Sequence, residues 1–530
     1  MFESDPVLVH EWLCRSARRM PEKEAIVCEG DRWTYEQLNS CSDNLAKLLA
    51  DLGVRRQDRV IICTGNSAET VVSLYGTLKA GGIFVILDSH VKPRRLRLVL
   101  EDSGARFLIA KASQAAAVEE ALEGLDNHLN VIWLGGEHRQ NYPHVPSIIW
   151  ETILSESFHG GGGSTILRSP SPRMVDLDLA AIIYTSGTTG KPKGVMCTHH
   201  NMISAARSII SYLDNREDDI LLDVLPLSFS YGLYQVLTSC MFGGTVVLER
   251  SFLYPHIAMT RIKEEVVTGF PLVPSMAAMV LSMESIGKYD LRTLRYLTSA
   301  GAALPAACYQ RLRRLVPHAE IFSMYGLTEC VRVSYLSGAE LDRHPTSVGR
   351  PMPNCDVRIV DEVGNEMAAD EAGELIIRGS NVAQGYWGDP ELTARTYRPG
   401  DCQVAPWLHS GDYFRRDTQG LLYFLGRKDD MIKTRGERVS PREVESVIAE
   451  IEDVADVAVV GVPDDLLGQA VKVFVVSRTG ELNGRAILRH CASRLESFMV
   501  PKYVEFVASL PRTSRGKIDT RELQYAGAAG

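Results

Sequence analysis

Apolar positions in the first hundred residues follow two alternating patterns. After Thr34, leucines recur at helical intervals as far as Gly53, and Gln37 stands three places after Thr34, the spacing of a helix capping box. Short continuous apolar runs occupy 60–63 and 83–87, with a helical pattern between them. Continuous apolar runs that alternate with helices are typical of buried, largely parallel strands. The pattern therefore predicts an α/β fold.

The last hundred residues have a pattern of their own. Ser440 followed by Pro441 and Glu443 is a helix start, because Ser caps the first turn and Pro favours the first helical position. Strand-like runs follow at 454–462 and 471–476. We expect a separate small α+β domain, with the boundary near Gly426 and Arg427.

Composition narrows the class of protein. A chain of 530 residues is long enough to form more than one domain. Its net charge of −9, without a basic tract, indicates that neither nucleic acid nor an anionic membrane is a partner. The sequence has no apolar stretch of membrane-spanning length and no secretory signal, and its eleven cysteines are scattered. We expect a cytoplasmic protein without membrane insertion.

One segment, 184–194, has the chemistry of a phosphate-binding loop. It follows an apolar strand and contains glycines that allow sharp turns, together with hydroxyls and lysines that donate hydrogen bonds to phosphate. Pro192 follows Lys191, so the segment is not a Walker A loop, which requires Ser or Thr there. The candidate phosphate-binding residues are Thr185, Ser186, Gly187, Thr188, Thr189, Gly190, Lys191 and Lys193.

This segment resembles the phosphate-loop signature of the adenylate-forming superfamily, which includes acyl- and aryl-CoA ligases, peptide-synthetase adenylation domains and luciferases. Five further segments, in the family's order, extend the resemblance over nearly the whole chain: 78–82, 325–329, 409–412, 426–430 and 511–517. The resemblance implies a large N-terminal AMP-binding domain of stacked mixed sheets with helices, residues 1–426. It also implies a small mobile C-terminal domain, residues 427–530, that carries a catalytic lysine.

The resemblance further implies an ATP-dependent acid–thiol ligase. A small carboxylic acid would attack the α-phosphate of ATP with release of pyrophosphate, and the acyl group would then pass from AMP to the thiol of CoA or of the phosphopantetheine on a separate carrier protein. An anionic nucleophile that attacks a polyanion needs concentrated positive charge. By resemblance Lys517 bridges the carboxylate and the α-phosphate, Thr328 contacts the α-phosphate, and Glu329 binds Mg²⁺, which prefers oxygen ligands.

The remaining nucleotide contacts also follow from the resemblance. Tyr325 would stack on the adenine, and Asp412, supported by Arg427, would accept the ribose hydroxyls. The full set for adenine and ribose is Gly301, Ala302, Ala303, Tyr325, Gly326, Asp412 and Arg427. The small domain would turn at Asp429, so that Lys517 leaves the site and Gly436 comes to lie against the phosphopantetheine arm.

The resemblance also implies an acyl pocket, which is mostly apolar in this chain. Its residues are Ser230, Tyr231, Tyr234, Thr298, Ala300, Met324, Arg332 and Val333. Relatives that activate α-amino acids carry an Asp where this chain has Ser230, and a buried ammonium without a counter-charge is costly. We therefore expect the enzyme to prefer a carboxylic acid of modest size, aliphatic or aryl, over the analogue that carries an α-amino group. Arg332 either meets a second carboxylate or carbonyl of the substrate or is a structural arginine.

Three alternatives remain at this point. One is a stand-alone amino-acid adenylation enzyme that loads a carrier protein in natural-product biosynthesis. Another is an oxidative, light-emitting member of the superfamily. The third is an inactive protein that only binds AMP or acyl-AMP, against which the presence of Lys517, Glu329 and Asp412 argues.

Overall fold

The structure is a computed structural model, and the chain in it divides into two compact units. It describes residues 5–124, 129–135, 147–150, 173–186, 192–302, 304–400, 405–428, 430–434, 437–464, 467–495, 497–512, 518–520 and 522–524. The first unit comprises Met1–Pro345, Pro351–Asp356 and Ile377–Leu408, and the second comprises Thr346–Arg350, Val357–Ile376 and His409–Gly530. The predicted domain boundary near Gly426 and Arg427 stays a prediction.

The first sheet of the first unit is mostly parallel. Its strands lie in the order β15-β14-β13-β12-β10-β11-β1-β2, and only the outer pairs β14–β15 and β1–β2 are antiparallel in this series. The bounds are β1 Glu24–Cys28, β2 Asp31–Thr34, β10 Ile220–Asp223, β11 Thr245–Leu248, β12 Gly269–Leu272, β13 Tyr296–Ser299, β14 Glu320–Tyr325 and β15 Ser334–Leu336.

The second sheet contains the apolar runs that the sequence pattern assigns to strands. It has the order β7-β6-β5-β3-β4-β8-β9, parallel except for the β8–β9 hairpin. The bounds are β3 Arg59–Cys63, β4 Ile83–Ile86, β5 Phe107–Lys111, β6 Asn130–Leu134, β7 Ser147–Ile149, β8 Leu179–Ser186 and β9 Pro192–Thr198. Its central strands are buried on both faces, as in Ile61 and Val85, so the predicted parallel α/β architecture is confirmed.

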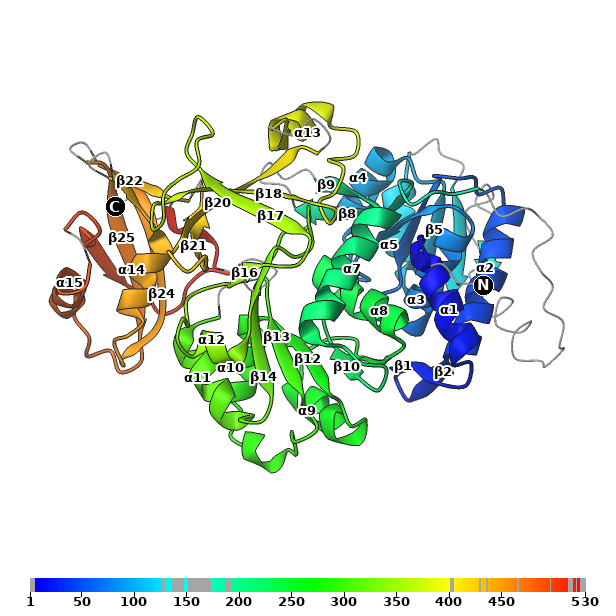
Figure 1. Ribbon diagram of the computed structural model, residues 1–530, viewed down its shortest axis with the longest axis horizontal. Coiled ribbons are helices and arrows are strands. Elements are labelled where there is room, and N and C mark those ends of the chain that lie inside the picture. Colours follow the sequence, from blue (N-terminus) through cyan, green and yellow to red (C-terminus); the bar gives the residue numbers. More distant parts are fainter. Residues whose placement is uncertain are drawn as a thin grey trace. The chain divides into compact units, whose positions relative to one another are not determined.

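Helices pack on both sheets of the first unit. Figure 1 shows α7 and α8 side by side, in green, and side-chain contacts from both reach the first sheet. The helices are α1 Val9–Arg19, α2 Tyr35–Asp51, α3 Ala68–Lys79, α4 Pro93–Ser103, α5 Ala115–Leu122, α7 His199–Leu213, α8 Ser230–Phe242, α9 Pro255–Glu264, α10 Pro274–Leu281, α11 Ala306–Leu315, α12 Gly338–Leu341 and α13 Pro390–Thr396, with 3-10 turns η1 Ala112–Gln114 and η2 Ile286–Lys288.

The predicted capping box of α2 is present. The Thr34 hydroxyl accepts a hydrogen bond from the Gln37 backbone, and the Gln37 side chain accepts one from the Thr34 backbone at 2.9 Å. These contacts satisfy two amide groups that have no partner within the helix. None of the helices in the described ranges has the length and apolar content that crossing a membrane requires.

The second unit is a small α+β layer. Its strands have the order β23-β22-β25-β24, and β26 pairs with β25 in parallel. Buried side chains of α14, such as Val444 and Ile448, lie in one apolar core with Val473 of β25. The bounds are β21 Leu422–Arg427, β22 Ile432–Thr434, β23 Glu437–Val439, α14 Pro441–Ile448, β24 Val454–Asp464, β25 Gly468–Ser477, α15 Gly484–Ala492 and β26 Tyr503–Phe506. Ser440 caps α14 as predicted, since its hydroxyl accepts from the Glu443 backbone.

Four of the described strands have residues in both units. They are β16 Arg350–Pro351, β17 Cys355–Val360, β18 Gly373–Gly379 and β20 Trp407–Arg416, and β19 Tyr397–Arg398 pairs with the first residues of β20. The remainder of β20 pairs with β21 inside the second unit.

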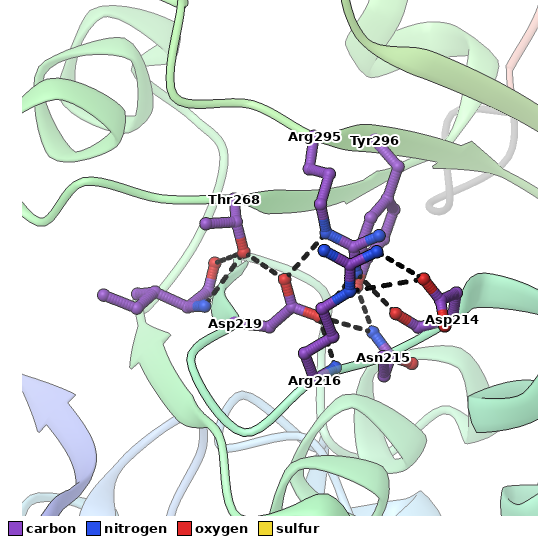
Figure 2. A network of polar contacts seen from close by, with 8 residues as sticks. Asp214, Asn215, Arg216, Asp219, Thr268, Arg295 and Tyr296 are labelled. Carbon is purple, nitrogen blue, oxygen red and sulfur yellow. Dashed lines mark hydrogen bonds and ion pairs between the residues drawn. The ribbon is translucent and has the colours of Figure 1, made fainter.

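A polar network holds the amino-terminal edge of the first sheet together. Asp219, directly before β10, is buried and binds Arg295 at 2.6 Å, and Thr268 donates to it at 2.8 Å (Figure 2). Burial opposes ionisation of Asp219, but the hydrogen bonds from Arg295, the Arg216 backbone and Thr268 outweigh it and lower the pKa. Three parallel strands are thereby joined at their start, and their carboxyl ends, where α/β sheets bind ligands, lie at the opposite edge.

Candidate active site

Several of the predicted nucleotide and acyl residues lie at or after the carboxyl ends of β13 and β14. The two strands are parallel neighbours, and Ser299 pairs with Ser323. Gly301 therefore follows one strand and Tyr325 ends the next, so the two segments are adjacent. Their contacts with adenine stay a prediction. Gly301 has a φ of +84°, in the left-handed region that favours glycine. Ala302 is exposed, and Ala303 lies outside the described residues.

A tight turn after β14 carries Thr328, Glu329 and Arg332. A Cβ on Gly326 would lie 2.2 Å from the Val331 carbonyl oxygen, so only glycine is accommodated there. Val331 itself has a φ of +63°, a strained conformation for a β-branched residue. The turn is closed by a 2.6 Å hydrogen bond from the Val331 N–H to the Leu327 carbonyl.

The predicted magnesium ligand Glu329 has a hydrogen-bond partner that sequence reasoning missed. Tyr386 donates to Oε1 of Glu329 at 2.7 Å, and the Lys193 ammonium lies 5.8 Å from the centre of the Tyr386 ring. The Ala383 N–H also donates to the Glu329 carbonyl at 2.8 Å. Tyr386 thus joins the predicted phosphate-loop lysine to the predicted metal carboxylate. No motif in the sequence pointed to it.

The predicted phosphate loop connects two antiparallel strands. Thr185 of β8 pairs with Lys193 of β9, and Ser186 pairs with Pro192. The backbone N–H of Trp387 donates to the Gly194 carbonyl at 2.7 Å, which holds the 383–387 segment beside β9. Gly187, Thr188, Thr189, Gly190 and Lys191 lie outside the described residues, so their phosphate contacts stay a prediction.

Several predicted acyl-pocket residues form one contact cluster. Tyr231 of α8 and Thr298 of β13 share a hydrogen bond of 2.7 Å, and the Arg332 guanidinium lies 4.8 Å from the Tyr231 ring centre. Ser230 is the first residue of α8, directly before Tyr231. The other members, Tyr234, Ala300, Met324 and Val333, are buried. The structure thus brings residues from α8, β13 and the turn after β14 together.

Tyr212 of α7 belongs to this cluster, although the sequence did not indicate it. Its hydroxyl donates to the Met324 sulfur at 3.1 Å, and its ring stacks on Tyr335 with centroids 4.1 Å apart. Burial raises the pKa of Tyr212, and the charge of Arg332 and a hydrogen bond with it oppose this rise. Tyr212 is far from every motif, so only the packing of α7 on β14 could reveal it.

In the second unit, Asp412 and Arg427 face each other across β20 and β21. They are directly paired in the antiparallel register, and their side chains form an ion pair of 2.8 Å. Asp412 is buried, whereas Arg427 is half-exposed. This pair orients the carboxylate that is predicted to accept the ribose hydroxyls.

A second ion-pair group supports the same strands. His409 Nδ1 and the Lys428 ammonium lie 3.4 Å and 3.2 Å from one oxygen of Glu374. Burial opposes ionisation of Glu374, but these two partners outweigh it and lower its pKa to about 2. The Gly411 N–H also donates to Glu374, so the carboxylate holds the turn before Asp412. Lys517, Asp429 and Gly436 lie outside the described residues.

Comparison with family models covers both units. A model of AMP-binding enzymes matches residues 13–387, and a model of the AMP-binding enzyme C-terminal domain matches residues 443–517.

Relatives and solved structures span nearly the full length of the chain. A long-chain-fatty-acid–CoA ligase of Salmonella typhimurium is 30% identical, with 96% of this chain and 92% of the relative covered. An indoleacetate–CoA ligase of Aromatoleum aromaticum is 30% identical, with 97% of each covered. The crystal structure of an anthranilate CoA ligase in complex with anthranoyl-AMP matches with a TM-score of 0.86 and 26% identity, over 99% of this chain and 98% of that one.

Proposed function

Because the chain belongs to the AMP-binding enzyme family, as its motifs predicted, we propose that it is an ATP-dependent acid–CoA ligase. It activates a carboxylic acid as acyl-AMP with release of pyrophosphate and then passes the acyl group to the thiol of CoA. CoA is the proposed acceptor because the relatives that cover the whole chain carry CoA-ligase names.

One observation of the structure carries the proposal. Tyr386 links Lys193 beside the phosphate loop to the Glu329 carboxylate through a cation–π contact and a hydrogen bond. An ammonium beside a hard oxygen ligand is the combination that a magnesium-bound polyphosphate needs.

The proposed reaction assigns a role to each group. Lys193 binds the phosphates of ATP, and Glu329 holds Mg²⁺, which neutralises phosphate charge when it is bound. Asp412, held by Arg427, accepts the ribose hydroxyls. Lys517 brings the acid carboxylate and the α-phosphate together, where positive charge stabilises the pentavalent transition state.

The test separates the two half-reactions. ATP–pyrophosphate exchange is measured over a panel of acids, and thioester formation is measured from preformed acyl-adenylate. Lys517→Ala should lower exchange by at least about a hundredfold, because a preorganised charge is removed from the phosphoryl-transfer site. Thioester formation should survive much better.

The matched control is Lys502→Ala in the same unit. Lys502 is exposed, and its contacts with Asp464 and the Tyr503 ring involve none of the predicted site residues, so exchange should be unchanged. Equal loss of both half-reactions in Lys517→Ala would show that Lys517 is not specific to adenylation. Absence of acid-dependent exchange over the whole panel would contradict the ligase itself.

A further inference from the structure

Arg332 is a buried cation without an acidic partner among the described residues. The residue is 4% exposed, and its Nε has no hydrogen-bond partner within the described ranges. A guanidinium stays charged at every physiological pH, so removal from water is costly unless an anion or several acceptors replace the water. The structure therefore leaves a positive charge in need of a counter-charge.

The groups around Arg332 compensate its charge only in part. The guanidinium lies 4.8 Å from the Tyr231 ring centre and near the Tyr212 hydroxyl. The Tyr231 hydroxyl already shares a hydrogen bond with Thr298 at 2.7 Å, and the Tyr212 hydroxyl donates to the Met324 sulfur at 3.1 Å. Aromatic faces and phenols attract a cation, but they carry no full negative charge. The neighbouring rings and hydroxyls thus attract the guanidinium but do not neutralise its positive charge.

The backbone that presents Arg332 is strained and held from outside. Val331, directly before it, has a φ of +63°. The buried Asn381 side chain donates to the carbonyls of Cys330 and Arg332, each at 2.9 Å, and so clamps the turn on both sides of Val331. A strained β-branched residue persists only where its surroundings enforce it, and such strain concentrates at functional sites. The strain and the hydrogen bonds from Asn381 therefore favour a functional role for this turn.

We propose that Arg332 is the specificity-determining residue for a second carboxylate, and that the acid activated is a dicarboxylic acid. This inference rests on the ligase function proposed above, because Tyr231, Thr298 and Met324 around Arg332 are residues of the predicted acyl pocket. One carboxylate of the substrate is adenylated, and the other pairs with the guanidinium and does not react.

The chemistry favours a carboxylate over a neutral group. An ionised carboxylate supplies the missing charge and two acceptor oxygens that match the planar fork of the guanidinium. A ketone or amide oxygen supplies neither the charge nor the bidentate geometry. Relatives that activate amino acids bind an ammonium with an Asp at the position of Ser230. Because Ser230 is neutral, it adds no negative charge that would repel a substrate carboxylate.

The test compares diacids with their own monoamides. Succinic, glutaric and adipic acids are each assayed beside the matching monoamide by ATP–pyrophosphate exchange, and each pair is also titrated calorimetrically with wild type and Arg332→Gln. Wild type should prefer at least one diacid over its monoamide by at least about tenfold in kcat/KM, since a site built for a charged group rejects the analogue that lacks it. Arg332→Gln should lose that preference mainly through KM, and Arg332→Lys should keep part of it.

The control is Arg378→Gln. The Arg378 guanidinium also lies over an aromatic ring, 4.6 Å from the Trp407 ring centre, but neither residue belongs to the predicted acyl pocket. It should leave the diacid preference unchanged. Thermal unfolding of Arg332→Gln checks the fold, and the Arg332→Lys variant retains the charge if the glutamine variant unfolds.

Two results would overturn the inference: equal use and equal binding of every diacid and its monoamide by wild type, or an unchanged preference in Arg332→Gln. If no acid supports exchange, the ligase function fails. The calorimetric preference for a diacid then still decides the role of Arg332.

Discussion

Tyr386 donates a 2.7 Å hydrogen bond to Oε1 of Glu329, although the two residues stand 57 positions apart in the sequence. The neighbouring backbone strengthens the link, because the Ala383 N–H donates to the Glu329 carbonyl. A phenol that holds one carboxylate oxygen fixes the orientation of the other. Partners of this kind tune a metal ligand without touching the metal.

Tyr386→Phe should therefore weaken Mg²⁺ binding. We expect the Mg²⁺ concentration for half-maximal ATP–pyrophosphate exchange to rise about tenfold, with a smaller change at saturating Mg²⁺. A magnesium titration of the exchange rate measures the effect.

Tyr397→Phe is the matched control for this titration. Its ring lies 6.0 Å from that of Tyr386, and its buried hydroxyl has no hydrogen-bond partner among the described residues. Removal of that hydroxyl should leave the magnesium dependence unchanged. Identical titration curves for Tyr386→Phe and wild type would show that the phenol does not orient Glu329.

Asp219→Ala should destabilise the first unit. The substitution leaves Arg295 without its 2.6 Å partner and removes the nearer acceptor of the Thr268 hydroxyl (Figure 2). Removal of one partner from a buried ion pair costs about 3 kcal/mol. Urea unfolding followed by tryptophan fluorescence should show the loss in the free energy of unfolding.

The control for Asp219 is Asp290→Ala, which breaks the Asp290–Arg292 pair at the surface of the same unit. Surface ion pairs contribute little, so the unfolding midpoint should stay the same. Equal effects of the two substitutions would mean that burial of Asp219 does not strengthen its pair.

Acid should destabilise the first unit through His199. Burial lowers the pKa of His199 from 6.5 to about 4, although the charges of Asp178 and Asp176 oppose the shift. Because the folded pKa lies below the unfolded one, the unfolded chain binds more protons at pH values below 6.5. Stability therefore falls as the pH falls from 6.5 towards 4. At pH 5 the loss from His199 is about 2 kcal/mol.

Urea unfolding at pH 7 and pH 5 measures this loss. His199→Asn keeps an acceptor for the Val9 N–H, which donates to Nδ1 at 3.0 Å, and it should lose about 2 kcal/mol less than wild type between the two pH values. His200→Asn changes the exposed neighbour and should keep the full pH dependence. A pH response of His199→Asn that equals the wild-type response would exclude this residue as the cause. His10, which is half-buried and whose pKa burial lowers to about 3, would then be the next residue to test.

Short-range patterns in the sequence predicted most of the local structure. The start of α2 at Thr34 and of α14 at Ser440 depends on hydroxyls that cap amides within three residues, so the sequence contains all the groups involved. The buried parallel strands were also predictable, because a strand covered on both faces is apolar at every position. The family could be identified because its motifs are short continuous segments.

The amino-acid sequence by itself determined the α/β class, the capped helices, the family and the candidate residues within its motifs. Only the tertiary structure decided which distant side chains complete them: Tyr386 on Glu329, Tyr212 on Met324, and Asn381 on the turn before Arg332. These contacts join strands and helices that are far apart in the chain. No periodicity or motif records such a contact, because it arises when sheets and helices pack together.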